Sequence, residues 1–105
     1  MIRNVVVGRL REAEDDRQAQ ADRRQLRAGL DGIAALRLPG VLANHCGLDV
    51  ELRAGGWDFA ITNDWIDAPA YEAYDTDPVH NVFRAQIVEV CEQVARVQFE
   101  IAPGL

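Results

Sequence analysis

The sequence predicts one α+β domain, residues 1–105, with the element order β-α-β-β-α-β and a short extra helix before the second main one. Valine-rich residues near the N-terminus predict a strand, and a long segment with apolar residues at helical spacing follows it. Alternating apolar and polar residues recur in the middle and at the end of the chain. A chain of 105 residues has the length of a domain that folds alone.

The first strand and the longer helix occupy the first 40 residues. Residues 2–10, IRNVVVGRL, contain three consecutive valines and predict the strand. Residues 14–36 predict the helix, because their apolar side chains fall on one face. Carboxylates at its start, Asp15 and Asp16, favour the positive end of the helix dipole. Its first half is polar on nearly all sides, so we expect that half at the surface, and residues 38–40, LPG, end the helix.

Two strands are predicted in the middle of the chain. Residues 41–52 predict the second strand, in which Gly47 is a candidate bulge or close-approach point. Residues 53–56, RAGG, predict a turn. Residues 57–65, WDFAITNDW, alternate as a half-buried strand does. Its two faces are expected to carry Trp57, Phe59, Ile61 and Trp65 on one side, and Asp58, Thr62 and Asp64 on the other.

The last third of the chain contains two helix starts. Asp67 is expected to cap a short helix over residues 68–74, and Asp77 to cap the second main helix, with Pro78 in its first turn. Residues 95–102 alternate again and predict the last strand. The apolar stripe of the second main helix is expected to consist of Val79, Val82, Phe83, Ile87, Val90 and Val94.

The predicted elements match the ferredoxin-like arrangement, in which both main helices cover one face of a four-stranded antiparallel sheet. The first strand is apolar on both sides, and a sheet face that carries valines is not stable in water. The last strand is expected to place Arg96, Gln98 and Glu100 on the uncovered face, which is therefore mixed. We expect a homodimer in which two sheets pack about a two-fold axis around a partly polar cavity.

The composition excludes several classes of function. A net charge of −6 argues against nucleic acid, because phosphate binding needs a basic stripe. All eleven basic residues are arginines, which removes Schiff-base and lysine-base chemistry. No apolar run approaches the roughly 20 residues that span a bilayer, and the N-terminal segment has no small-residue cleavage site. We therefore expect a cytoplasmic protein without a membrane partner.

No metal or cofactor is expected. His45 and Cys46 are neighbours on a strand and so point to opposite faces, and no Cys-x-x-Cys or His-x-x-x-His occurs. No glycine-rich loop precedes a helix. Cys46 and Cys91 are expected to be reduced and mostly buried. A nucleophilic pair of either thiol with His80 is chemically conceivable but rests on no motif.

Five short motifs occur in one order along the chain, beginning with IRNVVV at residues 2–7 and GLDV at residues 47–50. These two resemble the first strand and the end of the second strand of the stress-responsive dimeric α/β barrel (Dabb) domain family. Residues 56–80 are similar without gaps to its pattern of glycine-aromatic-aspartate, strand, aromatic residue, helix and a final Tyr-x-x-His-Pro-x-His. Here the final motif is YDTDPVH. The resemblance covers residues 2–100.

The resemblance implies a homodimer whose two sheets close into a dimeric α/β barrel around a pocket. One branch of the family comprises small cyclases that close polyketide chains by aldol chemistry without a cofactor. Carried over by position, the motif histidine that does acid-base work corresponds to His80, and the tyrosine that positions the substrate to Tyr74. The other acid-base histidine, on the first strand, corresponds to Asn4, which cannot transfer a proton. The first motif histidine corresponds to Asp77.

The candidate catalytic residues are therefore His80, Tyr74 and Asn4. A helix N-terminus favours a neutral imidazole that accepts a proton near pH 7, although an ionised Asp77 would oppose this. The alternative is that His80 is only part of the helix cap, with its N–H accepted by Asp77. Tyr74 and Asn4 would donate hydrogen bonds to a substrate carbonyl, or else be ordinary polar residues.

Three functions remain open at this point. The first is cyclase-like, cofactor-independent acid-base chemistry on a hydrophobic or aromatic carbonyl compound, bound between the sheet and the helices. The second is a non-catalytic ligand-binding or structural stress protein. The third is a cofactor-free monooxygenase of the antibiotic-biosynthesis type. None of the three uses a metal or a cofactor.

Overall fold

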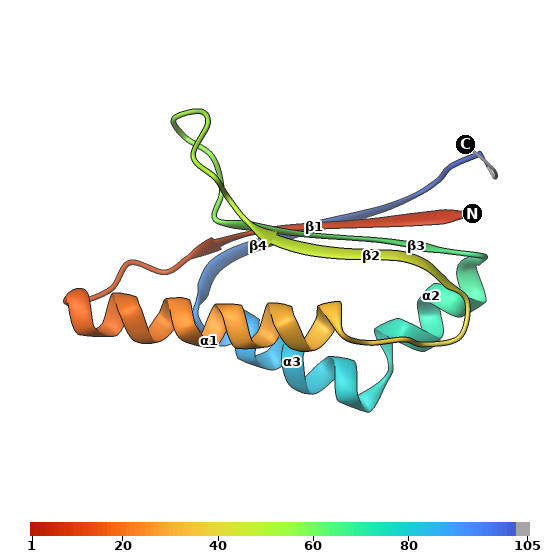
Figure 1. Cartoon of the computed structure of the whole chain (residues 1–105), viewed down its shortest axis with the longest axis horizontal. Coiled ribbons are helices and arrows are strands. Elements are labelled where there is room, and N and C mark those ends of the chain that lie inside the picture. The colour runs from red at the N-terminus through yellow and green to blue at the C-terminus, as the bar shows by residue number, and fades with distance from the viewer. Residues whose placement is uncertain (103–105) are drawn as a thin grey trace.

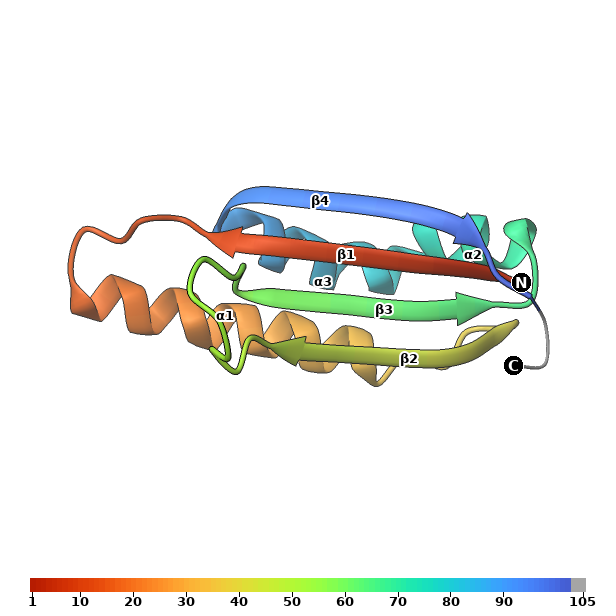
Figure 2. The same ribbon diagram turned by 90° about the horizontal axis from the view of Figure 1, so that it is seen from above.

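The chain folds into two layers, a sheet and a set of helices. The computed structural model describes residues 1–102. The four strands are all antiparallel and lie in the order β2-β3-β1-β4 (Figure 2). All helices cover the same face of the sheet (Figure 1). The predicted ferredoxin-like α+β fold is confirmed. Its elements are β1 Ile2–Leu10, α1 Asp16–Ala34, β2 Val41–Leu48, β3 Phe59–Trp65, α2 Ala68–Asp75, α3 Pro78–Glu89 and β4 Cys91–Glu100.

Aspartates cap all three helices, and the caps at Asp67 and Asp77 are those that the sequence predicts, whereas Asp15 was expected inside the start of the first helix. An N-cap carboxylate accepts one of the backbone N–H groups that the first turn leaves without a partner. For α3, Oδ2 of Asp77 accepts the N–H of His80 at 2.9 Å, and Pro78 occupies the first turn. The Asp-Pro pair therefore fixes where α3 starts, and with it the position of His80. The other two caps are Asp15 for α1 and Asp67 for α2.

The second strand is shorter than predicted and ends at Leu48 rather than at residue 52. The N–H of Asp49 donates to the carbonyl of Asp58 next to the last residue pair of the two strands and so closes the base of a loop. Glu51, within this loop, has a φ of 58°, which no strand residue adopts. The loop projects from the side of the sheet opposite to the helices (Figure 1).

Gly47 is neither a bulge nor a close-approach point. It pairs regularly with Ala60, and the place of an added Cβ has no heavy atom of the described chain within 4 Å. The irregularity of β2 lies between Val41 and Ala43 instead. The glycine that does need its missing side chain is Gly8, where an added Cβ would lie 2.1 Å from two ring carbons of the buried Phe59.

Trp57 does not share a face with the other aromatic residues near β3. It precedes the strand, and its ring lies 4.6 Å from the guanidinium carbon of Arg9. Gly8 of β1 contacts Phe59 on the helix side, so the next residue, Arg9, points to the open side. Trp57 therefore lies on the open face, while Phe59, Ile61 and Trp65 are buried under the helices as predicted.

The apolar stripe of α3 differs from the predicted one. Val79 and Val82 are 52% and 57% exposed, whereas His80 is 3% exposed. Residues one position apart differ by about 100° around a helix, so burial of His80 turns Val79 towards solvent. Ile87 and Val90 are buried as predicted. The sheet-facing side of α3 thus begins with a histidine instead of a valine.

The last strand begins at Cys91, directly after α3, and not at residue 95. Its faces are also the reverse of the prediction. Gln98 donates to Asn4 beneath the helices, and Arg96 lines a cavity there, so these residues and Glu100, which shares their alternation, face the helices. The open face instead carries Val97 and Phe99. A prediction that places polar residues on the open face fails here, because this part of the sheet lies over a polar cavity instead of the apolar core.

The core lies between the middle of the sheet and two helices, α1 and α3. Glycines in α1 allow α3 to approach closely: an added Cβ at Gly29 would lie 2.6 Å from Ile87, and one at Gly32 only 2.4 Å from Phe83. This close contact fixes the height of α3 above the sheet, and therefore the space beneath its first turn. The core consists of Leu26, Leu30, Ile33, Phe59, Ile61, Ile87 and Val90.

No helix in residues 1–102 is long and apolar enough to cross a membrane.

Candidate functional site

The three predicted site residues line one cavity. It lies between the helix side of the sheet and the helices α2 and α3, and has a volume of about 40 Å³. Asn4 comes from β1, Tyr74 from α2 and His80 from α3. Seven of the thirteen lining residues have purely hydrocarbon side chains, aliphatic or aromatic. The remaining six are Asn4, Tyr71, Tyr74, His80, Arg84 and Arg96.

His80 points into this cavity although its backbone belongs to the helix cap. Its ring stacks on that of Tyr74, with centroids 3.9 Å apart. Burial lowers the pKa of His80 to about 4, and the charge of Arg84 acts in the same direction. The carboxylates of Asp75 and Asp77 and the carbonyl of Tyr74 offset this only in part. The imidazole is therefore neutral at pH 7, and burial is the largest cause.

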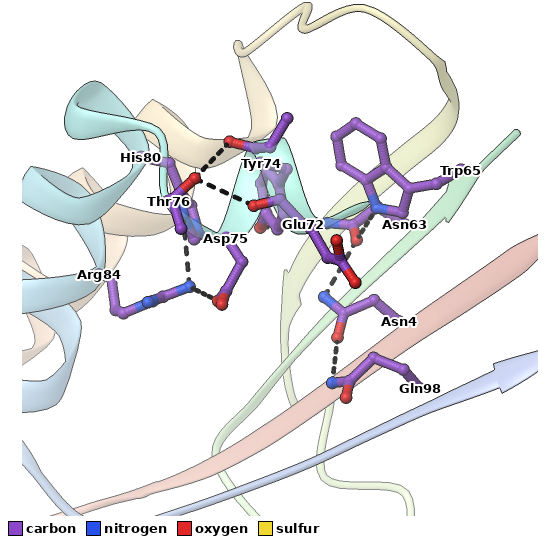
Figure 3. A network of polar contacts seen from close by, with 11 residues as sticks. Asn4, Asn63, Trp65, Glu72, Tyr74, Asp75, Thr76, His80, Arg84 and Gln98 are labelled. Carbon is purple, nitrogen blue, oxygen red and sulfur yellow. Dashed lines mark hydrogen bonds and ion pairs between the residues drawn. The ribbon is translucent and has the colours of Figure 1, made fainter. Parts of the chain in front are cut away.

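Arg84 and Asp75 were not identified from the sequence. Arg84 Nη2 donates to Oδ1 of Asp75 at 2.5 Å and lies 3.5 Å from Nδ1 of His80 (Figure 3). Arg84 follows His80 by four residues, so the two side chains lie on one face of α3. That spacing is the signal that would have indicated the contact. It places a positive charge beside the imidazole, at the edge of the cavity.

Tyr74 is buried and keeps its proton. Its ring lies between those of Trp65, 4.7 Å away, and His80. Burial raises the pKa of Tyr74 to about 12, although the hydrogen bond from Asn63 lowers it somewhat. Nδ2 of Asn63 donates to the hydroxyl oxygen at 3.2 Å. Because the oxygen accepts this bond, the hydroxyl hydrogen remains available to donate to another group.

A chain of side-chain amides crosses all four strands beneath the helices, and Figure 3 shows its part from Gln98 to Asn63. Gln98 donates to Oδ1 of Asn4 at 2.9 Å, and Nδ2 of Asn4 donates to Oδ1 of Asn63 at 3.0 Å. Asn63 also accepts the indole N–H of Trp65 at 2.8 Å and donates to Asn44 at 3.3 Å. Asn63 was not identified from the sequence, where its signal is an amide at an inward-facing position of an alternating strand. Asn4 thus retains one free N–H and reaches Tyr74 through Asn63.

The cysteines and the second histidine lie outside this site. Cys46 and Cys91 are both free and partly buried, and burial raises the pKa of each thiol to about 11. A thiol with this pKa is protonated at neutral pH and is a poor nucleophile. Cys46 packs against the core, whereas His45 is exposed beside Thr62. The predicted opposite orientation of His45 and Cys46 is therefore present.

The buried histidine makes the stability of the fold depend on pH. Between pH 6.5 and about 4 the unfolded chain binds a proton at His80 that the folded chain does not. The free energy of unfolding is therefore expected to fall by on the order of 2–3 kcal/mol as the pH decreases through this window. Urea unfolding at pH 7.5, 5.5 and 4.5 measures this, and His80→Gln should flatten the curve. An equal pH dependence in both proteins would contradict the burial of a neutral imidazole.

The family of the chain follows from a match to a protein-family model. The model of the stress responsive A/B barrel domain (Dabb) matches residues 2–101. The chain belongs to this family. The resemblance noted from IRNVVV and YDTDPVH is therefore confirmed. No curated protein sequence matches this Dabb chain.

Solved structures share the fold of this Dabb chain over nearly its whole length. A dimeric ferredoxin-like protein of unknown function from Thermobifida fusca YX is 26% identical, with 95% of this chain and 90% of that one covered and a TM-score of 0.73. A Dabb family protein with a ferredoxin-like fold from Mesorhizobium loti is 22% identical, covers 96% of both chains and has a TM-score of 0.69. A hydroxynitrile lyase from Passiflora edulis is 18% identical, with 99% and 95% covered and a TM-score of 0.64.

Proposed function

We propose that this protein is a homodimeric enzyme that binds a small carbonyl compound in the cavity and removes a proton from the carbon next to the carbonyl, without a cofactor. The observation that carries the proposal is a neutral imidazole beside a protonated phenol in one largely apolar cavity. A base and a hydrogen-bond donor held together in this way are what enolisation requires. Enolisation is also the first step of an aldol cyclisation.

The proposed step assigns one role to each group. The unprotonated ring nitrogen of His80 takes the proton, and the electron pair of the broken C–H bond forms the carbon–carbon double bond of the enolate. The carbonyl electron pair moves onto oxygen, where the free hydroxyl hydrogen of Tyr74 donates a hydrogen bond. Low polarity around the pair strengthens this bond relative to water. Protonated His80 then returns the proton to carbon. In an aldol cyclisation, the enolate carbon instead attacks a second carbonyl of the substrate, and protonated His80 gives its proton to the alkoxide that forms.

Asn4 acts mainly as a positioning residue in this proposal. The cyclase branch has a histidine at this position, whereas the oxygen of Asn4 accepts from Gln98 and one of its N–H groups donates to Asn63. Asn63 in turn donates to the oxygen of Tyr74. The remaining N–H of Asn4 is a second donor for the enolate oxygen. A single base, His80, therefore replaces the two histidines of the cyclases.

The second part of the proposal is the homodimer. The open face of the sheet carries Val97 and Phe99, which are 53% and 44% exposed in the single chain. The loop over residues 49–58 projects from the same side, with Val50 and Leu52 exposed on it (Figure 1). Apolar groups in this arrangement suit a second copy packed sheet to sheet, held by the loops at its edges. The Thermobifida fusca relative is described as dimeric, which supports the same assembly here.

The protein is expected to sediment at twice the mass of the 11.7 kDa chain. The exposed valine and phenylalanine of β4 lose water contact only in such an assembly, so the dimer should persist in dilute solution. Sedimentation velocity between micromolar and nanomolar concentrations measures this. A monomer at micromolar concentration would contradict the proposed dimer, without affecting the cavity chemistry.

Hydrogen–deuterium exchange at carbon tests the proposed chemistry without knowledge of the natural substrate. In D₂O, the protein should replace the protons next to the carbonyl of small ketones faster than buffer does, as measured by loss of their proton NMR signals. Exchange at the buffer rate across straight-chain and aryl ketones and keto acids would contradict the enolisation step. Binding without exchange would favour the non-catalytic alternative, and oxygen uptake with an electron-rich phenol would favour the monooxygenase.

A further inference from the structure

The charged residues of the cavity indicate what kind of carbonyl compound it accepts. We infer that the ligand carries a carboxylate, bound by Arg84 and Arg96 where the cavity meets solvent, so that the substrate class is a keto acid. The carbonyl group of this ligand rests on the proposed function, whereas its carboxylate is inferred from the two arginines alone. Arg84 and Arg96 are the two charged side chains among the lining residues, and no aspartate or glutamate of residues 1–102 lines the cavity.

The charge of the cavity runs against the charge of the protein. The chain has 17 acidic and 11 basic residues, so an average surface site on it is negative. The cavity wall instead combines two arginines with apolar residues. Asp75 pairs with Arg84, but Arg96 pairs with no carboxylate of residues 1–102, so the site keeps a net positive charge that attracts anions.

Both arginines have donors to spare. Arg84 uses Nη2 for Asp75, and a guanidinium has five N–H donors in a planar fork. Arg96 forms no ion pair with any of residues 1–102. Both arginines and Tyr71 line the same cavity. The charges of both guanidinium groups lower the pKa of Tyr71, whereas burial and the charge of Asp75 raise it. We place one carboxylate between the two guanidinium groups, where it accepts from both.

A carboxylate at this place would also activate the proposed base. The charge of Arg84 is one of the reasons why His80 is weakly basic in the free protein. An anion bound to Arg84 cancels part of that effect, so the pKa of His80 rises towards the working pH when the correct ligand is bound. General-base catalysis is most effective when these two values are close. An acid is thus both better bound and more readily enolised than its neutral analogue.

The probes are levulinate (4-oxopentanoate) and its longer straight-chain homologues, each compared with its methyl ester. Calorimetry at low salt should show acids binding at least about tenfold more tightly than their esters, since hydrogen bonds to a charged group are about twice as strong as those between neutral groups. Arg96→Gln should remove most of this preference. Arg17→Gln, an exposed arginine in the first turn of α1, should not. Equal affinity of acid and ester, an unchanged preference in Arg96→Gln, or no binding by any acid would overturn the inference.

A second readout separates this inference from the proposed function. NMR titration of the His80 imidazole should show a higher pKa with the acid bound than with the ester, and the difference should vanish in Arg96→Gln. An unchanged pKa would also overturn the inference. Acid-selective binding without exchange at carbon would contradict only the proposed enolisation. Exchange of neutral ketones with no preference for acids would contradict only the carboxylate.

Discussion

Replacing Asn63 by leucine is expected to destabilise the fold by on the order of 3–5 kcal/mol. Asn63 is 1% exposed, and its amide makes four hydrogen bonds, two accepted and two donated. Leucine has a similar volume but leaves the indole N–H of Trp65 and the amide of Asn4 without their buried acceptor. Each buried group left without a partner costs about 1–3 kcal/mol. Urea unfolding at a fixed protein concentration measures the loss.

The matched control is the same substitution, asparagine to leucine, at a buried amide whose oxygen has no hydrogen bond to lose. The side-chain oxygen of Asn81 is buried and has no hydrogen-bond partner in residues 1–102. Asn81→Leu therefore removes an unsatisfied group, and should change the free energy of unfolding by less than about 1 kcal/mol or increase it. A loss below 1 kcal/mol in Asn63→Leu would mean that water replaces the amide. In that case Asn63 would not position Tyr74.

The place of His80 in the first turn of a helix could be predicted because its signal is local. Asp77 and Pro78 mark a helix start through capping and a fixed φ, interactions that reach only three residues along the chain. The order of elements follows from the same kind of local pattern. These signals placed His80 at a helix start and gave the order of elements, whereas Tyr74 was identified by its position in the family motif YDTDPVH.

The prediction of which faces of β4 and α3 are buried was wrong because it assumed that every buried position is apolar. The prediction placed apolar residues under the helices and Arg96 and Gln98 in the open. Beneath the first turn of α3, however, the helices cover a cavity with an amide network, which demands polar partners. The apolar residues Val97 and Phe99 then occupy the other face. A local inversion of the hydrophobic pattern therefore coincides with the candidate site, as expected where function competes with packing.

The network itself could not be predicted because its members are far apart in sequence. Asn4, Asn63 and Gln98 meet only through the register of β1 with both of its neighbours, in which Asn4 pairs with Asn63 on one side and with Gln98 on the other. A single sequence specifies alternation along a strand but not which residues lie opposite each other. Asn4 was therefore identified through the family position alone, and its partners were missed.

His80→Gln is expected to reduce the exchange at carbon by on the order of 10²- to 10⁴-fold, the usual contribution of a general base. Glutamine retains polar atoms in the cavity but cannot take up a proton. In the unmodified protein the exchange rate should fall as the pH decreases through about 4, because protonation of His80 removes the base. With a keto acid bound, the fall should begin at a higher pH.

Two further variants test whether the loss belongs to this imidazole and its neighbour. His45→Gln removes the other histidine, which is exposed beside Thr62 on the open side of the sheet, and should leave the exchange unchanged. Tyr74→Phe keeps the stack against His80 but removes the hydroxyl, so the pH profile should persist at a lower rate. If His80→Gln retained both the rate and its pH profile, another group would be the base, and the cavity would have to be interpreted as a binding site alone.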